Sequence, residues 1–388
     1  MYLLVMLTFF LHGCLGTEVK PKPPHETIVF QNGQEGYNCY RIPAILKTPK
    51  GHLLAFAEAR RNNCGDFGDV EIVMKRSVDN GKSWEGLQVV ADNSAHQAGN
   101  QAPVMDLTDK RFPKGRLFLF YNTGSAHEQE VREGKAIREI WYKTSLDEGK
   151  TWSEPINITL QVSKPKHPAA HPSYTFVEDW RSYANTPGHG LQIQNGTYRG
   201  RIFIAANHSE GPPKAQFKDY IAHGFYTDNH GESFQLSPNV EYAGSNEAIA
   251  AETSNGSLLF NCRNQSGDAK YRLQAFTKNA GETWDEVKVM TDVPDPVCQG
   301  SMIDYQPKKS KKVLILSNLN SQTKREKLTV RISIDDGQSW SKGKELYAGS
   351  AAYSDLVVQN DNSIGVLYER DEYSKIVYTS FTYEWLVK

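Results

Sequence analysis

An eight-residue pattern occurs five times along the chain and constrains its fold more than any other feature. The pattern is Ser/Thr-x-Asp/Asn-x-Gly-x-Ser/Thr-Trp/Phe, and its copies occupy residues 77–84, 145–152, 227–234, 277–284 and 333–340. Each copy stands between two β-rich segments, so the glycine can take a positive φ in a hairpin turn while the Asp or Asn side chain accepts hydrogen bonds from turn amides. The terminal aromatic ring would then pack beneath the hairpin.

The spacing of the copies predicts how many such units the chain contains. Their glycines stand at positions 81, 149, 231, 281 and 337, which are 50 to 82 residues apart. This period fits a propeller blade of four strands with loops of variable length. Five visible copies, plus one blade without a recognisable copy that is closed by pairing of the two chain ends, predict an all-β, six-bladed β-propeller.

The acidic residues of the pattern allow a second interpretation, in which they bind a metal ion or a substrate. Two copies carry Asn229 and Asn279 in place of aspartate, and an amide serves a turn as well as a carboxylate but is a poorer metal ligand. We therefore interpret the repeated aspartates as turn residues on the outside of the fold. The sequence also contains no His-Glu-x-x-His metal motif.

Charge and hydropathy exclude some classes of partner. The 388 residues carry a net charge of −1, so no global field favours nucleic acid or an acidic membrane surface. We expect no nucleic-acid partner and no stable membrane anchor, because the longest apolar run, over residues 3–15, is too short to span a bilayer. Nothing in the sequence identifies a protein partner.

The N-terminal segment has features of a secretory signal. The run from Leu3 to Leu15 ends in small residues, and Lys20-Pro21-Lys22-Pro23-Pro24 forms a stiff extended linker. No Lys or Arg precedes the apolar run, which leaves a buried N-terminal strand as the alternative. We expect a signal peptide over 1–16, a linker over 17–27 and a single propeller domain over 28–388, in a protein that is secreted or lysosomal.

The cysteine content is consistent with an oxidising compartment. Removal of the signal leaves Cys39, Cys64, Cys262 and Cys298, and four cysteines allow three pairings. We favour a Cys39–Cys64 bridge, because both residues would flank the inner face of one blade; four unpaired cysteines acting as small hydrophobes are the alternative. Five Asn-x-Ser/Thr sequences, at Asn157, Asn195, Asn207, Asn255 and Asn264, also suit a secreted protein.

One arginine near the first strand pair has apolar neighbours. It is Arg41, in Cys39-Tyr40-Arg41-Ile42-Pro43-Ala44, and a buried guanidinium needs an anion. The Tyr-Arg-Ile-Pro sequence, the five repeats, which are of the kind called Asp boxes, and Tyr353-Ser354-Asp355-Leu356 together resemble the exo-α-sialidases of the animal and bacterial glycoside hydrolase type. The resemblance extends from about Ile28 to the C-terminus. It implies a six-bladed propeller with its site at the central axis.

The resemblance also implies three catalytic residues. Tyr353 corresponds to the nucleophile of the family, and Glu247, in Asn246-Glu247-Ala248, corresponds to the base that assists it. Asp66, in the Gly-flanked loop Cys64-Gly65-Asp66-Phe67-Gly68-Asp69, corresponds to the acid/base residue, with Asp69 as its local competitor. The implied mechanism requires no metal ion or organic cofactor.

The substrate-binding residues follow from the same resemblance. Three arginines that bind the substrate carboxylate correspond to Arg41, Arg263 and Arg325, and Arg331 is a rival for the third position. Glu58 resembles the carboxylate that braces the first arginine. Asn100 and Gln299 are expected to be polar residues that line the pocket.

The chemistry of sialic acid explains these residue types. Its anomeric carbon bears a carboxylate, which arginines can hold through bidentate hydrogen bonds. A neutral phenol avoids the repulsion that a carboxylate nucleophile would meet there, and sialidases are the tyrosine exception among retaining glycosidases. The expected function is retaining hydrolysis of terminal α-linked sialic acids from glycoproteins, glycolipids and oligosaccharides. The alternatives are a non-catalytic sialic-acid-binding propeller, and a glycosidase of other specificity that would use two carboxylates and no arginine cluster.

Overall fold

The computed structural model describes residues 24–308 and 310–388. The expected signal peptide over 1–16 lies outside these residues, as does most of the expected linker. Within them, no helix has the length and apolar character needed to cross a membrane. The helices are short: α1 (Glu128–Arg132), α2 (Thr159–Val162), η1 (Ala215–Phe217) and α3 (Tyr383–Val387).

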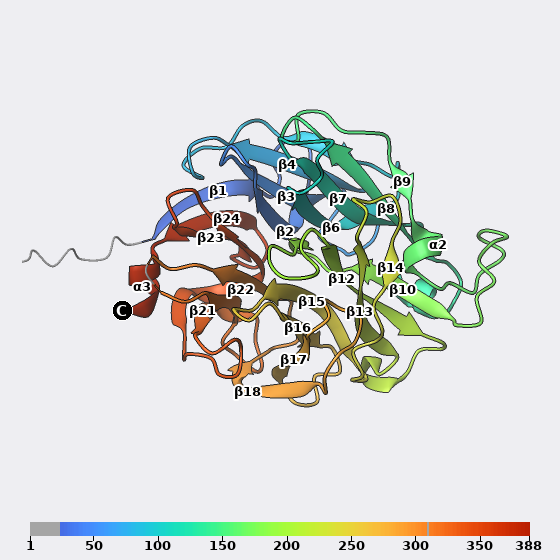
Figure 1. Ribbon diagram of the computed structural model, residues 1–388. Helices are drawn as coiled ribbons and strands as arrows, with labels where there is room; N and C mark the ends of the chain where they lie inside the picture. The colour runs from blue at the N-terminus through green and yellow to red at the C-terminus, as the bar shows by residue number, and fades with distance from the viewer. Residues whose placement is uncertain (1–23, 309) are drawn as a thin grey trace, which may run out of the picture.

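The strands of the described residues form six antiparallel blades arranged in a ring (Figure 1). Blade one contains β2 (Cys39–Lys47), β3 (Leu53–Arg60), β4 (Val70–Ser77) and β5 (Gln88–Ala91), and blade two contains β6 (Gln97–Asp106), β7 (Arg116–Gly124), β8 (Arg138–Ser145) and β9 (Ile156–Asn157). Blade three contains β10 (Trp180–Asn185), β11 (Leu191–Gln192), β12 (Ile202–Glu210), β13 (Tyr220–Thr227) and β14 (Gln235–Leu236). Blade four contains β15 (Ser245–Glu252), β16 (Leu258–Asn264), β17 (Tyr271–Thr277) and β18 (Lys288–Pro294).

The last two blades share a long strand. Blade five contains β19 (Ser301–Tyr305), β20 (Val313–Leu319), β21 (Glu326–Ser333) and the first half of β22 (Lys344–Val358). The second half of β22 pairs with β23 (Ile364–Arg370), which is followed by β24 (Lys375–Phe381) and, from the start of the chain, by β1 (His25–Gln31). The predicted all-β, six-bladed propeller is confirmed.

The two ends of the chain close the ring. β1 pairs antiparallel with β24, from His25 opposite Ser380 to Gln31 opposite Lys375. β1 therefore begins inside the stretch that we expected to be linker, because its backbone completes the ladder of blade six. The fourth strand of this blade comes from the other end of the chain, so no hairpin joins β24 to β1. This explains why six blades carry five boxes.

All five boxes form turns of the kind expected. In the first, the Ser77 hydroxyl accepts a hydrogen bond from the amide of Gly81 (2.8 Å), and Asp79 Oδ1 accepts one from the amide of Ser83 (2.9 Å). Asn279 accepts the corresponding amide at the same distance, 2.9 Å. Amide and carboxylate are interchangeable here, which supports the turn interpretation over a metal or substrate site.

The boxes also join each blade to the one before it. The rings of Trp84 and Tyr378 of blade six lie 5.6 Å apart, and those of Phe234 and Phe120 of blade two lie 5.7 Å apart. Gly81 has φ +79°, and a Cβ on it would lie 2.1 Å from the Tyr378 ring. Glycine is thus required both by the turn and by the close approach of the neighbouring blade.

The structure contains the expected disulfide. Cys39 and Cys64 are bonded, while Cys262 and Cys298 are buried and unpaired in the described part of the chain. Of the possible glycosylation sites, Asn207 and Asn264 are buried, whereas the other three asparagines are exposed.

A buried ion pair joins four blades at the axis. Asp355 on β22 is fully buried and binds His189 Nδ1 (2.8 Å), the Ser301 hydroxyl of β19 (2.7 Å) and the Ile45 amide of β2 (2.8 Å). Burial alone would lower the pKa of His189, but the charge and hydrogen bond of Asp355, with a further contribution from Asp304, raise it above its ordinary value. The imidazolium form is therefore favoured by folding.

This pair predicts a pH-dependent contribution to stability. Because the pKa of His189 is raised on folding, its contribution is fully present below the unfolded value and is lost as pH rises through the folded value. We expect His189→Gln to lower the melting temperature more at about pH 5 than at about pH 8. Thermal unfolding of both proteins across this range measures the gap, and a gap that does not change with pH would contradict the prediction.

Candidate active site

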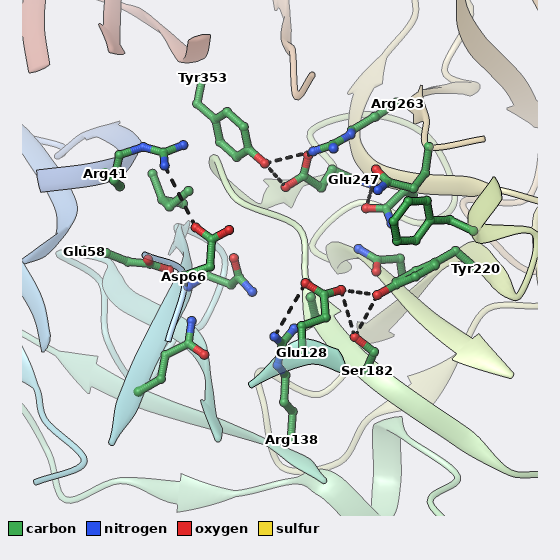
Figure 2. A pocket seen from close by; sticks show the side chains of 18 of the residues that line it. Arg41, Glu58, Asp66, Glu128, Arg138, Ser182, Tyr220, Glu247, Arg263 and Tyr353 are labelled. Atoms are coloured by element: carbon green, nitrogen blue, oxygen red, sulfur yellow. Dashed lines mark hydrogen bonds and ion pairs between the residues drawn. The ribbon is translucent and has the colours of Figure 1, made fainter. Parts of the chain in front are cut away.

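A cavity of about 420 Å³ opens at the axis, and all six blades contribute to its lining (Figure 2). Eight of the nine residues expected from the sequence line it: Arg41, Glu58, Asp66, Asn100, Glu247, Arg263, Arg325 and Tyr353. These residues are far apart in the chain, so only the ring of blades brings them together. The exception is Gln299.

Bulges direct several of these side chains into the cavity. The inner strands β2, β6, β10, β15 and β22 each carry a register irregularity near the cavity, between residues 41 and 44, 99 and 102, 181 and 184, 245 and 248, and 351 and 354. In β2 the bulge places Ile42 at φ +57°, which is rare for a β-branched residue. The Tyr-Arg-Ile-Pro sequence thus encodes a bulge that presents Arg41.

Tyr353, Glu247 and Arg263 form one hydrogen-bonded group (Figure 2). The Tyr353 hydroxyl donates to Glu247 Oε1 (2.5 Å), while Arg263 donates to Glu247 Oε2 (2.7 Å) and to the phenol oxygen (3.0 Å). The phenol is therefore held by a proton acceptor on one side and a cation on the other. This is the arrangement of a nucleophile with its base.

The surroundings of Tyr353 oppose its ionisation. Burial is the main cause that raises the pKa of this phenol well above its ordinary value, and the charge of Glu247 adds to it; Arg263 and Arg325 lower the pKa only in part. The phenol therefore keeps its proton, and it can become a nucleophile only as Glu247 takes that proton.

Three guanidinium groups surround the Tyr353 ring. The Cζ atoms of Arg41 and Arg325 lie 5.7 and 5.8 Å from its centroid, and Arg263 contacts its hydroxyl. Arg325 donates to the Val297 carbonyl (2.9 Å) and has no ion pair among the described residues. Arg331, its rival, lies elsewhere and donates to the carbonyls of the 341–342 turn. The cluster therefore presents uncompensated positive charge to an anion.

The carboxylate that braces Arg41 is Glu369, not Glu58. Glu369 is fully buried on β23; its Oε1 accepts from Arg41 Nε (2.7 Å) and the Ile42 amide (2.8 Å), and its Oε2 accepts from the Tyr353 amide (3.2 Å). Glu58 stands opposite Arg41 in the β2–β3 register, but its carboxylate pairs with Arg60 (2.6 Å). Our expectation for Glu58 is wrong because Arg60 lies on the same face of β3, two residues away.

Asp66 lies at the mouth of the cavity, in the β3–β4 loop. Its side chain is 69% exposed and pairs with Arg60 (2.9 Å) and, more loosely, with Arg41 (3.9 Å). Partial burial would raise the pKa of this carboxyl, but the charges of Arg60 and Arg41 outweigh it and hold the pKa below its ordinary value. Asp69, the competitor, pairs with Arg61 and lies outside the cavity lining.

Gln299 and Asn100 have different surroundings. Gln299 is buried outside the cavity, where its amide exchanges hydrogen bonds with the backbone of Ser354 (both 3.0 Å), so the expectation that it lines the pocket is wrong. It links the residues before β19 of blade five to the second half of β22, which belongs to blade six. Asn100 does line the cavity, and its backbone amide donates to Glu58 (2.9 Å).

A second polar cluster faces Tyr353 across the cavity (Figure 2). Glu128 of α1 accepts hydrogen bonds from the hydroxyls of Tyr220 and of Ser182 (3.1 Å), and Arg138 lies 3.9 Å from it. Such a group suits hydroxyls of a ligand. Sequence reasoning missed it, because the five-residue helix that carries Glu128 has no motif.

Tyr373, also missed, supports two of the arginines. The Arg41 guanidinium lies 4.1 Å from its ring centroid, and Arg325 donates to its hydroxyl (3.3 Å). Residues Asp371, Glu372 and Tyr373 all have positive φ, from +53° to +66°. Three such residues in succession are strained, and strain of this kind collects at binding sites.

Among the described residues, the three that could jointly hold a metal ion lie away from the cavity. They are Asp106, Asp109 and His230. Asp109 already pairs with Arg111 and Arg116, and Asp106 binds His230 (2.8 Å). These contacts give the cluster a structural explanation.

Comparisons with known proteins agree with this site. Residues 51–366 match the BNR repeat-like domain. A sialidase of Micromonospora viridifaciens is 31% identical over 376 residues, a match that covers 92% of this chain and 53% of the relative, so the chain spans about half of that protein's length. Sialidase-2 of Cricetulus griseus is 29% identical over 379 residues, covering 90% of this chain and 93% of the relative.

Solved structures share the architecture. The Hadza microbial sialidase Hz136 superposes with a TM-score of 0.79 at 24% identity, covering 93% of this chain and 69% of that chain, which shows a common fold. The match to the repeat family covers most of the chain and includes all five boxes together with most of the cavity-lining residues. With its box hairpins and its arginine-lined axis, the chain belongs to the BNR repeat-like family and is a member of the exo-α-sialidase family.

Proposed function

We propose that this protein is an exo-α-sialidase, which removes terminal α-linked sialic acids from glycoproteins, glycolipids and oligosaccharides with retention of configuration. The observation that carries the proposal is the arginine cluster of Arg41, Arg263 and Arg325 around a tyrosine that is hydrogen-bonded to Glu247. A carboxylate bound by these arginines brings the carbon that bears it close to the phenol. Few ligands other than a sialic acid carry a carboxylate on the carbon to be attacked.

In the first step, the Tyr353 oxygen bonds to the anomeric carbon as its proton passes to Glu247. The bond from that carbon to the leaving oxygen breaks, and Asp66 donates a proton to this oxygen. The products are a sialyl–tyrosine intermediate and the free hydroxyl of the leaving sugar. Arg263 remains paired with Glu247 and holds it in place.

In the second step, water replaces the tyrosine at the anomeric carbon. Asp66, now ionised, takes a proton from the water, and Glu247 returns its proton to the phenol oxygen as the bond to carbon breaks. Two displacements restore the original configuration. Both carboxyls end in their starting protonation states.

Asp66 must be protonated before it can act as an acid, although Arg60 and Arg41 hold its pKa below the ordinary value. A substrate carboxylate bound beside Arg41 would offset part of the positive charge that holds the pKa of Asp66 down. We therefore infer that substrate binding raises this pKa. The enzyme should work best in acid and lose activity as pH rises, because the ionised carboxylate cannot donate a proton.

The lectin alternative has less support. A sialic-acid-binding propeller would need the arginines but not the pair of Tyr353 and Glu247 or the aspartate at the mouth. All three catalytic positions are filled, and Tyr353 and Glu247 lie within hydrogen-bond distance. The cluster around Glu128 would bind hydroxyls of the sugar in either case.

We also propose that the protein passes through the secretory pathway and is secreted or lysosomal. The apolar run at residues 3–15 and the disulfide between Cys39 and Cys64 support this. An enzyme that needs Asp66 in its protonated form would be most active in an acidic compartment.

Release of sialic acid from sialyllactose over a pH series tests the function. We expect kcat, which reports the enzyme–substrate complex, to be highest at about pH 4 to 5 and to fall toward neutral pH, as a carboxyl acid requires. Nuclear magnetic resonance of the first-formed product should identify the α-anomer of free sialic acid. Binding of sialosides without turnover would favour the lectin, and a rate independent of pH would remove Asp66 from its role.

A further inference from the structure

The disulfide lies beside two residues of the active site. Cys39 stands two residues before Arg41 on β2, and Cys64 stands two residues before Asp66 in the β3–β4 loop. It therefore joins the strand that carries a substrate-binding arginine to the loop that carries the acid/base residue. The two ends of this link differ in burial: Cys39 is buried and Cys64 is exposed.

The Cys39 end is firmly fixed. Cys39 is fully buried and stands opposite Arg60 in the β2–β3 ladder. The Asn32 amide nitrogen lies 3.6 Å from its sulfur and 3.8 Å from that of Cys64, and donates to the Tyr373 carbonyl (2.9 Å). Asn32 thus fixes the bridge to the turn that supports the arginines.

The Cys64 end lies in a loop with little support of its own. Residues 61–66 are exposed, and no residue from 61 to 69 belongs to a hydrophobic core cluster of the described chain. The loop is held by the Arg61 amide donating to the Asp69 carbonyl (3.1 Å) and by Arg60 donating to the Cys64 carbonyl (2.6 Å). At its start, the Arg61 guanidinium also donates to Glu71 (2.7 Å) and lies 4.8 Å from the Tyr37 ring centroid. Within the described chain, residues 62–65 have no such side-chain contact with the blades apart from the bridge and the Asn32 contact to its sulfur. Few buried contacts and an exposed backbone are the marks of a segment that opens easily.

The ion pairs of Asp66 cannot hold the loop at the moment of catalysis. Its carboxylate pairs with Arg60 and Arg41 only while it is charged. The acid step uses the protonated carboxyl, whose attraction to the guanidinium groups is much weaker. A covalent link does not depend on protonation, so its contribution is largest when Asp66 is ready to donate its proton.

We propose that the Cys39–Cys64 disulfide positions Asp66 for general acid catalysis, and that its reduction selectively impairs proton donation to the leaving group. This inference rests on the proposed function. The cysteines touch neither substrate nor reacting atoms and act through the position of Asp66. Reduction by dithiothreitol transfers two electrons and two protons to the bridge, which gives two thiols and the cyclic disulfide of the reagent.

The test compares two substrates with different leaving groups. An aryl sialoside expels a stable phenolate that needs little protonation, whereas sialyllactose expels a sugar alkoxide that needs an acid. For Cys39→Ser/Cys64→Ser we expect kcat/KM on sialyllactose to fall roughly tenfold to a hundredfold, since a misplaced acid loses much of its contribution. On the aryl substrate we expect a fall of less than about threefold.

Two further measurements keep the test decisive. In an Asp66→Asn background, removal of the bridge should cause no additional loss on sialyllactose, because the bridge acts through the carboxyl. Dithiothreitol treatment of the folded unmodified protein should reproduce the substrate-dependent loss even where the double variant folds poorly, and should not alter the double variant.

The outcomes separate this inference from the proposed function. Equal losses on both substrates, no loss on sialyllactose, or an added loss in the Asp66→Asn background would overturn the positioning role while leaving the sialidase activity intact. Failure of the unmodified protein to hydrolyse either substrate would instead overturn the proposed function.

Discussion

Tyr353→Phe should reduce the kcat for sialyllactose by about a thousandfold while preserving binding of a sialic acid analogue, since the change removes the nucleophile and leaves the arginines in place. The phenyl ring would still pack between Arg41 and Arg325. Glu247 would keep its ion pair with Arg263 (2.7 Å), so no buried charge would lose its partner. The measurement is steady-state hydrolysis beside calorimetric titration of a non-hydrolysable analogue.

The control for this variant removes the same atom elsewhere. The Tyr305 hydroxyl donates to the Asn362 carbonyl (2.9 Å) and accepts from the Asn362 side-chain amide (2.9 Å), outside the cavity. Tyr305→Phe should leave kcat unchanged and lower stability by about 1 to 3 kcal/mol, the usual contribution of two hydrogen bonds. A Tyr353→Phe protein with full activity would show that the tyrosine is not the nucleophile.

Arg41→Ala should raise the KM for sialyllactose by about thirtyfold or more. Loss of one partner of a buried, hydrogen-bonded charge pair costs about 2 to 5 kcal/mol, and about 1.4 kcal/mol corresponds to tenfold. The variant should also be less stable, by about 3 to 5 kcal/mol, because the fully buried Glu369 loses its cation. Kinetics and thermal unfolding are measured on the same preparation.

Arg331→Ala separates the two effects. Arg331 is also buried, but it binds backbone carbonyls of a turn outside the cavity. We expect it to lower the melting temperature and to leave KM unchanged, whereas Arg325→Ala should raise KM as Arg41→Ala does. If Arg331→Ala raised KM equally, the loss in Arg41→Ala would reflect weakened folding and not anion binding.

Local patterns predicted the repeating part of the fold because each box contains its own turn chemistry. The Asp or Asn side chain and the glycine act within eight residues, so five boxes could be counted, and closure of one further blade by the two chain ends gave six. Two features of the fold could not be predicted from the sequence, because they depend on partners that are distant in the chain. One is that β22 serves two blades, and the other is that β1 already starts at His25, within the expected linker, because β24 offers it a free edge.

The residues of the active site also fall into two groups, those that local sequence motifs predict and those that depend on distant partners. Residues within distinctive motifs, such as Arg41 and Tyr353, line the cavity as expected. The brace was misassigned because Glu58 is close to Arg41 in the sequence, whereas Glu369 reaches it from the last blade, 328 residues away. The cluster at Glu128 and the strained turn at Tyr373 carry no local signature, since they become recognisable only when the blades meet.

The bulges of the inner strands have a consequence for how such a site can change over time. Each is a short interruption, and regular pairing resumes beyond it towards the opposite end of the same strand. A substitution at one bulge therefore acts at the cavity, whereas the box contacts that join each blade to its neighbour lie elsewhere. Selection can accordingly change the substrate preference of this ring at its bulges while the box contacts continue to hold the blades together.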